Sequence, residues 1–200
     1  TTDLTRAKIL PENQGISFQG PSPKGPFDID SDVASTMLSA GPNVNGRPNA
    51  DVVRPLASAI DLTRRSRGKW TIDFGLLSKE EAAQYEVPFE YVRRKVYPIR
   101  AKNRRASYAA VWWQYAEARP GMREALEHLP RYIVTPRISK HRVFEWLNPE
   151  VLANDGTIVF ARHDDYFLGV LHSTPHELWA LRRGTFLEDR PRYTPTTTFE

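Results

Sequence analysis

Residues 131–144 read Arg131-Tyr132-Ile133-Val134-Thr135-Pro136-Arg137-Ile138-Ser139-Lys140-His141-Arg142-Val143-Phe144, and this stretch says most about the fold. Residues 132–135 form an apolar run that is typical of a buried strand. Residues 142–147 are a second strand candidate. Between the two runs, residues 137–142 present five polar side chains in six positions. The pattern therefore predicts two strands joined by a polar turn.

Short elements are predicted on both sides of this stretch. Capping residues and apolar spacing indicate helices at residues 30–39, 49–59, 78–85, 88–96 and 122–129, and a further helix with Thr174 as its N-cap. Strands are predicted at residues 16–19, 70–74 and 157–161. The apolar run at residues 166–171 fits a strand or a helix. Sixteen Pro and eleven Gly are dispersed among these elements, so we expect a loop-rich α+β fold.

Composition limits the class of protein. Two hundred residues with 40% hydrophobic content suffice for a real core, in one large domain or two small ones. The lack of Cys excludes disulfides and thiolate metal sites and fits a reducing cytoplasm. No apolar run approaches the roughly 20 residues needed to span a membrane, so we expect no membrane partner. The first residues include neither an initiator Met nor an apolar leader, which we interpret as a fragment of a longer chain.

Basic residues are concentrated in the middle of the chain. Residues 91–142 contain thirteen Lys or Arg and three acids, a side-chain charge of +10, whereas the other 148 residues sum to −6. No acid occurs between residues 91 and 116. Because a solvated surface normally mixes both signs, the segregation predicts contact with a polyanion, with nucleic acid as the leading candidate. A basic surface without a ligand and an acidic protein partner are the alternatives.

The candidates for phosphate contact are the cations of this run and of the cluster before residue 70. They are Arg64, Arg65, Arg67, Lys69, Arg93, Arg94, Lys95, Arg100, Lys102, Arg104 and Arg105. Three aromatic residues nearby, Trp112, Trp113 and Tyr115, keep open an RNA-binding role by base stacking. Adjacent tryptophans pack in a core more often than they stack on bases.

The sequence contains no recognisable catalytic motif. It has no phosphate-binding loop followed by Lys-Ser/Thr, no G-x-G-x-x-G and no G-x-S-x-G. Asp73, Glu90 and Lys95, with residues 163–165 (His-Asp-Asp), keep open a stand-alone metal-dependent nuclease as an alternative. Two of the five histidines are four residues apart, but the Glu of a zinc peptidase helix is missing between them. We therefore predict no metal site.

Several strings resemble, in the same order, the target recognition domain of MmeI-like adenine-specific DNA methyltransferases, of type IIL restriction-modification and related phage-defence systems. They are residues 15–20, 49–55, 70–75, 81–83, 112–113, 131–144 and 164–173, followed by His176 and Trp179. Each string alone is weak evidence, whereas the combination is specific. The resemblance covers about residues 13–200.

This resemblance implies a role in a larger enzyme. Residues 13–192 would form the target recognition domain, residues 1–12 a linker from an absent methyltransferase core, and residues 193–200 a linker to the following segment. The family's catalytic N-P-P-Y motif and cofactor-binding glycine motif are missing here. The segment would therefore select a site in double-stranded DNA without binding a cofactor itself. S-adenosylmethionine and adenine N6 methylation would belong to the methyltransferase domain of the same parent chain, in a bacterial cytoplasm.

The polar turn and the start of the helix near residue 174 are the predicted base-reading edges. The candidates for base contact are Arg137, Ser139, Lys140, His141, Arg142, Ser173, Thr174 and His176. Such side chains distinguish base pairs by donor and acceptor pattern in the major groove. For the Lys and Arg side chains phosphate contact is an equal alternative, and the hydroxyls of Ser173 and Thr174 can instead serve as helix caps.

Overall fold

Strand β5 (Tyr132–Pro136) lies inside a four-stranded antiparallel sheet and is buried along its whole length. It pairs with β8 (Thr157–Phe160) on one side and with β6 (Glu145–Leu147) on the other, and β1 (Ser17–Gln19) completes the sheet beyond β8. The computed structural model describes residues 7–200, so residues 1–6 of the predicted N-terminal linker lie outside the described residues.

Side chains of β5 alternate between two cores. Ile133 packs in a cluster with Phe199, whereas Tyr132 and Val134 pack in another cluster with Met122 of α7 (Pro120–Leu126). A strand that is covered on both faces reads as a continuous apolar run instead of an alternating one. The prediction of a buried strand at residues 132–135 is therefore confirmed.

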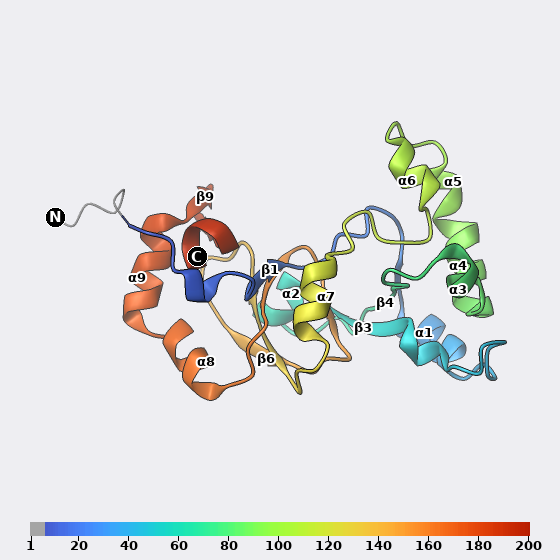
Figure 1. Cartoon of the computed structure of the whole chain (residues 1–200), viewed down its shortest axis with the longest axis horizontal. Helices are drawn as coiled ribbons and strands as arrows, with labels where there is room; N and C mark the ends of the chain where they lie inside the picture. The colour runs from blue at the N-terminus through green and yellow to red at the C-terminus, as the bar shows by residue number, and fades with distance from the viewer. Residues whose placement is uncertain (1–6) are drawn as a thin grey trace.

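A second four-stranded sheet lies toward the other end of the elongated molecule (Figure 1). Its strand order is β2 (Asp28–Ile29), β4 (Trp70–Ile72), β3 (Val53–Ala57) and β7 (Leu152–Ala153). The β3–β7 pair is parallel, and the other pairs are antiparallel. Because β7 is followed closely by β8, the chain passes from the second sheet into the first at this point.

The helices are short and gather at the ends and between the sheets (Figure 1). Beside the second sheet lie α1 (Ser31–Leu38), α3 (Lys79–Ala83), α4 (Glu86–Lys95), α5 (Tyr97–Arg100) and α6 (Ala106–Ala110). The middle holds α2 (Ala59–Thr63) and α7, and the opposite end holds α8 (Asp165–Leu171), α9 (Thr174–Arg183) and the hairpin β9 (Thr185–Leu187) and β10 (Arg190–Arg192). Single turns occur at Pro11–Asn13, Asn49–Asp51 and Pro195–Phe199. Within residues 7–200, no helix is long and apolar enough to cross a membrane.

The α+β prediction is confirmed, and the structure corrects or decides three of the expected elements. The predicted helix at residues 49–59 is wrong, because only one 3-10 turn forms before β3, whose pairing with β4 and β7 overrides the capping signal. The undecided run at residues 166–171 is helical, since Asp164 caps it by accepting a hydrogen bond from Phe167 N at 2.8 Å. The N-cap of α9 is Ser173 and not Thr174.

The segment that the resemblance assigns to a C-terminal linker is packed against the fold. Trp179 Nε1 donates a hydrogen bond to Thr198 O at 2.9 Å, and Tyr193 and Phe199 are buried. Leu10 N in turn donates to Glu200 O at 2.9 Å. Residues 10 and 200 therefore lie side by side. The predicted domain boundaries stay a prediction.

Candidate nucleic-acid interface

The basic residues after α4 form a projection at one end of the molecule. We call residues 93–110, which comprise the end of α4, α5 and α6, the basic arm; α5 and α6 stand out from the body in Figure 1. Arg94, Lys95, Lys102 and Arg104 are exposed on it. Within residues 7–200 none of these four has an ion-pair or side-chain hydrogen-bond partner. Their positive charges are thus available to a ligand.

Two further cations of the basic arm are engaged locally. Arg93 donates from Nε and Nη2 to the two carboxylate oxygens of Glu90, at 2.7 and 3.1 Å. These hydrogen bonds hold the pKa of Glu90 below its usual value. Arg105 donates from Nη1 to the hydroxyl of Tyr108 at 2.8 Å and lies over its ring. The Arg93–Glu90 pair is electrically neutral, whereas Arg105 retains its charge.

Arg100 does not reach the surface. Its side chain is fully buried, at 0% relative exposure. Its guanidinium donates to the backbone carbonyls of Pro23, Tyr108 and Gln114 and lies over the rings of Phe27 and Tyr108. The predicted phosphate contact of Arg100 is therefore wrong, because a side chain with no exposed area cannot touch a ligand on the outside.

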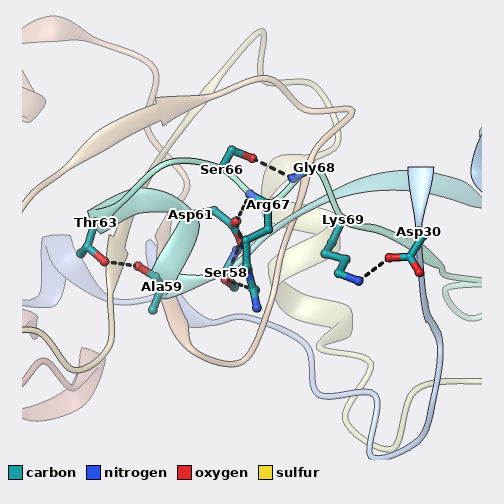
Figure 2. Close-up of polar contacts among 9 residues, drawn as sticks. All are labelled: Asp30, Ser58, Ala59, Asp61, Thr63, Ser66, Arg67, Gly68 and Lys69. Atoms are coloured by element: carbon teal, nitrogen blue, oxygen red, sulfur yellow. Dashed lines mark hydrogen bonds and ion pairs between the residues drawn. The ribbon is translucent and has the colours of Figure 1, made fainter. Parts of the chain in front are cut away.

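The cluster at residues 64–69 follows α2 and is organised by one carboxylate (Figure 2). Asp61 accepts a hydrogen bond from Ser58 N at 2.9 Å, the capping-box contact of α2, and further hydrogen bonds from Ser58 Oγ and from Arg67 N at 2.9 Å. Arg67 Nη2 also donates to Ser58 Oγ at 2.8 Å. Burial opposes ionisation of Asp61, but these hydrogen bonds outweigh it and hold its pKa at about 2. The loop is thereby fixed at its base.

Two of the four cations of this loop are paired with acids, and two are not. Arg67 is paired with Asp61, and Lys69 forms an ion pair with Asp30 (Figure 2). Arg64 and Arg65 are exposed, with no side-chain partner among the described residues. With the four unpaired cations of the basic arm, they make six predicted phosphate contacts that have no ion-pair or side-chain hydrogen-bond partner among the described residues.

The polar turn after β5 (residues 137–142) is fixed by hydrogen bonds to neighbouring backbone segments. Its backbone is fixed by hydrogen bonds from Arg137 N to Gly156 O at 2.8 Å and from Ser139 N to Pro191 O at 3.3 Å. Ser139 Oγ donates to His141 O at 2.7 Å. Lys140 and His141 are exposed. These two side chains are the parts of the turn most accessible to a ligand.

Arg142 supports this turn from the inside. Its guanidinium donates to the carbonyls of Pro136 and Pro191, the latter at 3.1 Å, and to Thr135 Oγ1 at 3.3 Å. It also lies 5.3 Å from the ring centre of Tyr193. Burial lowers the pKa of Arg142 to about 10, so it stays charged at neutral pH. We assign Arg142 to the internal support of the turn instead of base contact.

The second predicted edge, at the start of α9, is mostly internal as well. Ser173 Oγ caps the helix by accepting from His176 N, and it donates to Val170 O at 2.7 Å. His176 Nε2 lies 3.0 Å from the Tyr193 hydroxyl, and burial, followed by the charge of Arg142, lowers the pKa of His176 to about 4. Of the three candidates here, Thr174 alone is exposed.

The hairpin β9–β10 joins the polar turn and was not predicted. Pro191 and Arg192 of β10 pair with the turn through Ser139 N and through a bridge between Ile138 and Arg192. Lys140 Nζ lies 4.0 Å from a carboxylate oxygen of Asp189 at the hairpin tip. Two-residue hairpin loops usually carry Asn-Gly or Asp-Gly, whereas this one has Glu188 at φ 58° followed by Asp189. The usual sequence signal was therefore missing.

The residues proposed for a nuclease are not brought together. Asp73 is buried and accepts two hydrogen bonds from Arg123, at 2.8 and 2.9 Å. Glu90 instead pairs with Arg93. Asp164 caps α8, and Asp165 pairs with Arg131. Each acid therefore serves a different local contact.

The histidine pair contacts the core and not a common ligand site. His172 Nε2 lies 2.9 Å from Phe144 O, and the His172 and His176 rings both pack edge-on against Phe144. Among residues 7–200, no group of three or more His, Asp or Glu is placed to hold a metal ion.

The aromatic residues considered for RNA stacking are core residues. Trp112, Trp113 and Tyr115 are 6%, 9% and 4% exposed. Trp113 Nε1 donates to Leu77 O at 3.0 Å. Their burial confirms the prediction that the tryptophans pack in a core and argues against the RNA-stacking alternative, because a base needs an open ring face.

The fold is shared with a restriction-modification enzyme. The structure matches that of the type IIL restriction-modification enzyme MmeI in complex with DNA with a TM-score of 0.72 and 16% sequence identity, over 96% of this chain and 24% of the MmeI chain. The chain thus corresponds to about a quarter of that enzyme's length. No protein-family model and no curated protein sequence matches this chain.

Proposed function

We propose that this chain is the DNA-recognition domain of a larger site-specific adenine methyltransferase in a bacterial restriction-modification or related phage-defence system. The observation that carries the proposal is the group of exposed, unpaired cations at Arg94, Lys95, Lys102 and Arg104, on a fold shared with an enzyme solved on DNA. Uncompensated cations of this kind release the counterions of a nucleic acid backbone when they bind it.

Two surfaces divide the work of recognition in this proposal. The basic arm and the hairpin strand β9 lie at opposite ends of the long axis and project to the same side of it in Figure 1. A duplex lying along that side would touch both. The basic arm would neutralise phosphates without regard to sequence, and the polar turn with its hairpin would enter the major groove.

The accessible groups at the second surface suit base reading. Lys140 and His141 lie on the polar turn, Thr174 starts α9, and Asp189 lies beside Lys140. A Lys ammonium donates to guanine O6 and N7, a carboxylate accepts from cytosine N4, and a hydroxyl suits either kind of edge. Because the backbone of the turn is hydrogen-bonded to the hairpin, the backbone positions that carry these side chains are preorganised.

The chemistry itself would come from the parent chain. A methyltransferase domain carrying S-adenosylmethionine would rotate the target adenine out of the stack, because the exocyclic amino group cannot be reached inside a duplex. The present domain would fix the register of the enzyme on the DNA. Its ligand is double-stranded DNA, and its protein partner is the methyltransferase domain of the same chain, acting in the bacterial cytoplasm.

The test is selection of bound duplexes from a random-sequence library by the purified chain. We expect a defined consensus, and Lys140→Ala should relax it at one base pair with a loss of about 1–3 kcal/mol of discrimination. Lys79→Ala, an exposed lysine on the distant helix α3, is the matched control and should leave the consensus unchanged. Failure of the wild-type chain to bind duplex would refute the proposal. An unchanged consensus for Lys140→Ala would remove the polar turn from the base-reading surface.

A further inference from the structure

The helices of the basic arm that project from the body are too short to be stable by themselves. Helices α5 and α6 contain four and five residues, far below the roughly 12–15 that an isolated helix needs to be even marginally stable in water. The four unpaired cations repel one another. What keeps the basic arm folded must therefore come from its contacts with the body.

Arg100 supplies those contacts at the root of the arm. It is the last residue of α5. The backbone carbonyls that accept hydrogen bonds from its guanidinium come from three separate segments: Pro23 near the N-terminal end, Tyr108 of α6, and Gln114 beyond α6. One planar guanidinium thus joins both ends of the arm to the body. Arg has five donors in a rigid fork, whereas the Lys ammonium is a compact point charge with three rotatable donors on a flexible stem.

The site around Arg100 is suited to a guanidinium. The central carbon of the Arg100 guanidinium, Cζ, lies over the rings of Phe27 and Tyr108, at 5.7 and 5.1 Å from the ring centres. A Cβ atom placed on Gly25 would lie 3.2 Å from the Phe27 ring, 3.3 Å from Val96 Cγ1 and 3.4 Å from Arg100 Nε, so the backbone passes close to this site. The hydrogen-bond acceptors are all neutral carbonyls, and Nε has none. Burial of a charge without a counterion costs free energy, and among the described residues no acid pairs with Arg100 to offset that cost. We infer that the several hydrogen bonds of the planar guanidinium, and not an ion pair, account for an arginine at this position.

We propose that Arg100 is a positioning residue for DNA binding by the basic arm. It touches no DNA, and it holds the loop of residues 101–105 so that Lys102 and Arg104 contact phosphates at the same time. Asn103 N donates to Arg100 O at 3.0 Å, and Arg105 N donates to Asn103 Oδ1 at 2.9 Å. These bonds transmit the placement of Arg100 into the loop. The inference rests on the proposed function, because it assigns a cause to the geometry of that interface.

The experiment measures the salt dependence of duplex binding for the wild-type chain, Arg100→Lys, Lys102→Ala/Arg104→Ala, and the combination of all three changes. Removing two phosphate contacts should reduce the log-log slope by about 1.8. Arg100→Lys keeps the charge but loses the fork, and we expect a similar reduction. In the combined variant the further loss should be near zero, because the arm cations are already misplaced. Hydrogen exchange of residues 101–111 without DNA should also become faster in Arg100→Lys.

Three results would overturn the inference: a wild-type slope in Arg100→Lys, full additivity in the combined variant, or unchanged hydrogen exchange. Tyr108→Ala is a second variant, which covers the case in which Arg100→Lys does not fold. It removes, without changing charge, the ring that both Arg100 and Arg105 lie over. We expect it to reduce the slope in the same direction, and a wild-type slope would equally overturn the inference. If the wild-type chain shows no salt-dependent binding, the proposed function fails, while faster exchange in Arg100→Lys would still support the positioning role.

Discussion

Two neighbouring arginines on α4 allow the proposed phosphate contact of the basic arm to be tested with a control on the same helix. Arg94 is exposed and unpaired, whereas Arg93 is neutralised by Glu90. Arg94→Ala removes one available charge and should lower the log-log salt slope of duplex binding by about 0.9. Over a fourfold increase in salt, the affinity of the wild type should then fall about 3.5-fold more than that of the variant. Glu90→Ala/Arg93→Ala removes a neutral pair, and its slope should stay at the wild-type value.

Fluorescence anisotropy of a labelled duplex, titrated at several salt concentrations, gives these slopes directly. Alanine is a strong helix former, so α4 should persist in both variants, and circular dichroism checks this. Equal slopes for Arg94→Ala and the wild type would refute the argument, because the available charge would then lie away from the phosphates. A larger effect of the neutral double substitution would refute it as well, since ion pairing would not govern which cations bind.

Three further predictions concern local contacts that stabilise the fold. Asp61→Asn should lower the free energy of unfolding by about 2 kcal/mol at neutral pH. Because the folded-state pKa of Asp61 is depressed to about 2, the difference between variant and wild type should persist above pH 4 and vanish as the pH falls toward 2. Denaturant titrations at several pH values measure it. Asp73→Asn should cost about 3–5 kcal/mol by leaving Arg123 without its buried partner, and a denaturation midpoint equal to that of the wild type would contradict this. Gly20→Ala should reduce the thermal midpoint strongly, because its Cβ would lie 2.6 Å from the carbonyl carbon of Asn154; calorimetry showing an unchanged midpoint would count against the close approach.

Local signals predicted the elements that depend on local physics. Ser78 and Glu81 announce α3 because a capping box needs residues only three positions apart. The buried run around Ile133 announces β5 because both faces of that strand are covered. The pattern at residues 49–59 misled because the pairing of β3 with β4 and with the distant β7 decides its conformation. Nothing within those eleven residues encodes that partner.

The candidate interface shows the same division. Counting charges located the run of cations that the structure places on the basic arm, and most of them are exposed, which is the usual state of Arg and Lys. It could not separate Arg94 from Arg100, because the burial of Arg100 depends on the carbonyls of Pro23 and Gln114. Nor could it show that Arg142 is engaged with Pro191, 49 residues away in sequence. The hairpin with its Glu188-Asp189 tip lacked the usual turn residues and gave no signal.

The distance along the molecule between the basic arm and the hairpin affects how binding would proceed in time. Under the proposed function, unscreened charges govern the rate of encounter, whereas close contacts govern how long a complex lasts. The basic arm would thus capture the duplex first at any sequence and keep the domain nearby while it diffuses along the DNA. Residence would lengthen only where the polar turn finds its base pairs. The basic arm and the hairpin would then set two separate rate constants, so association and dissociation could be altered independently.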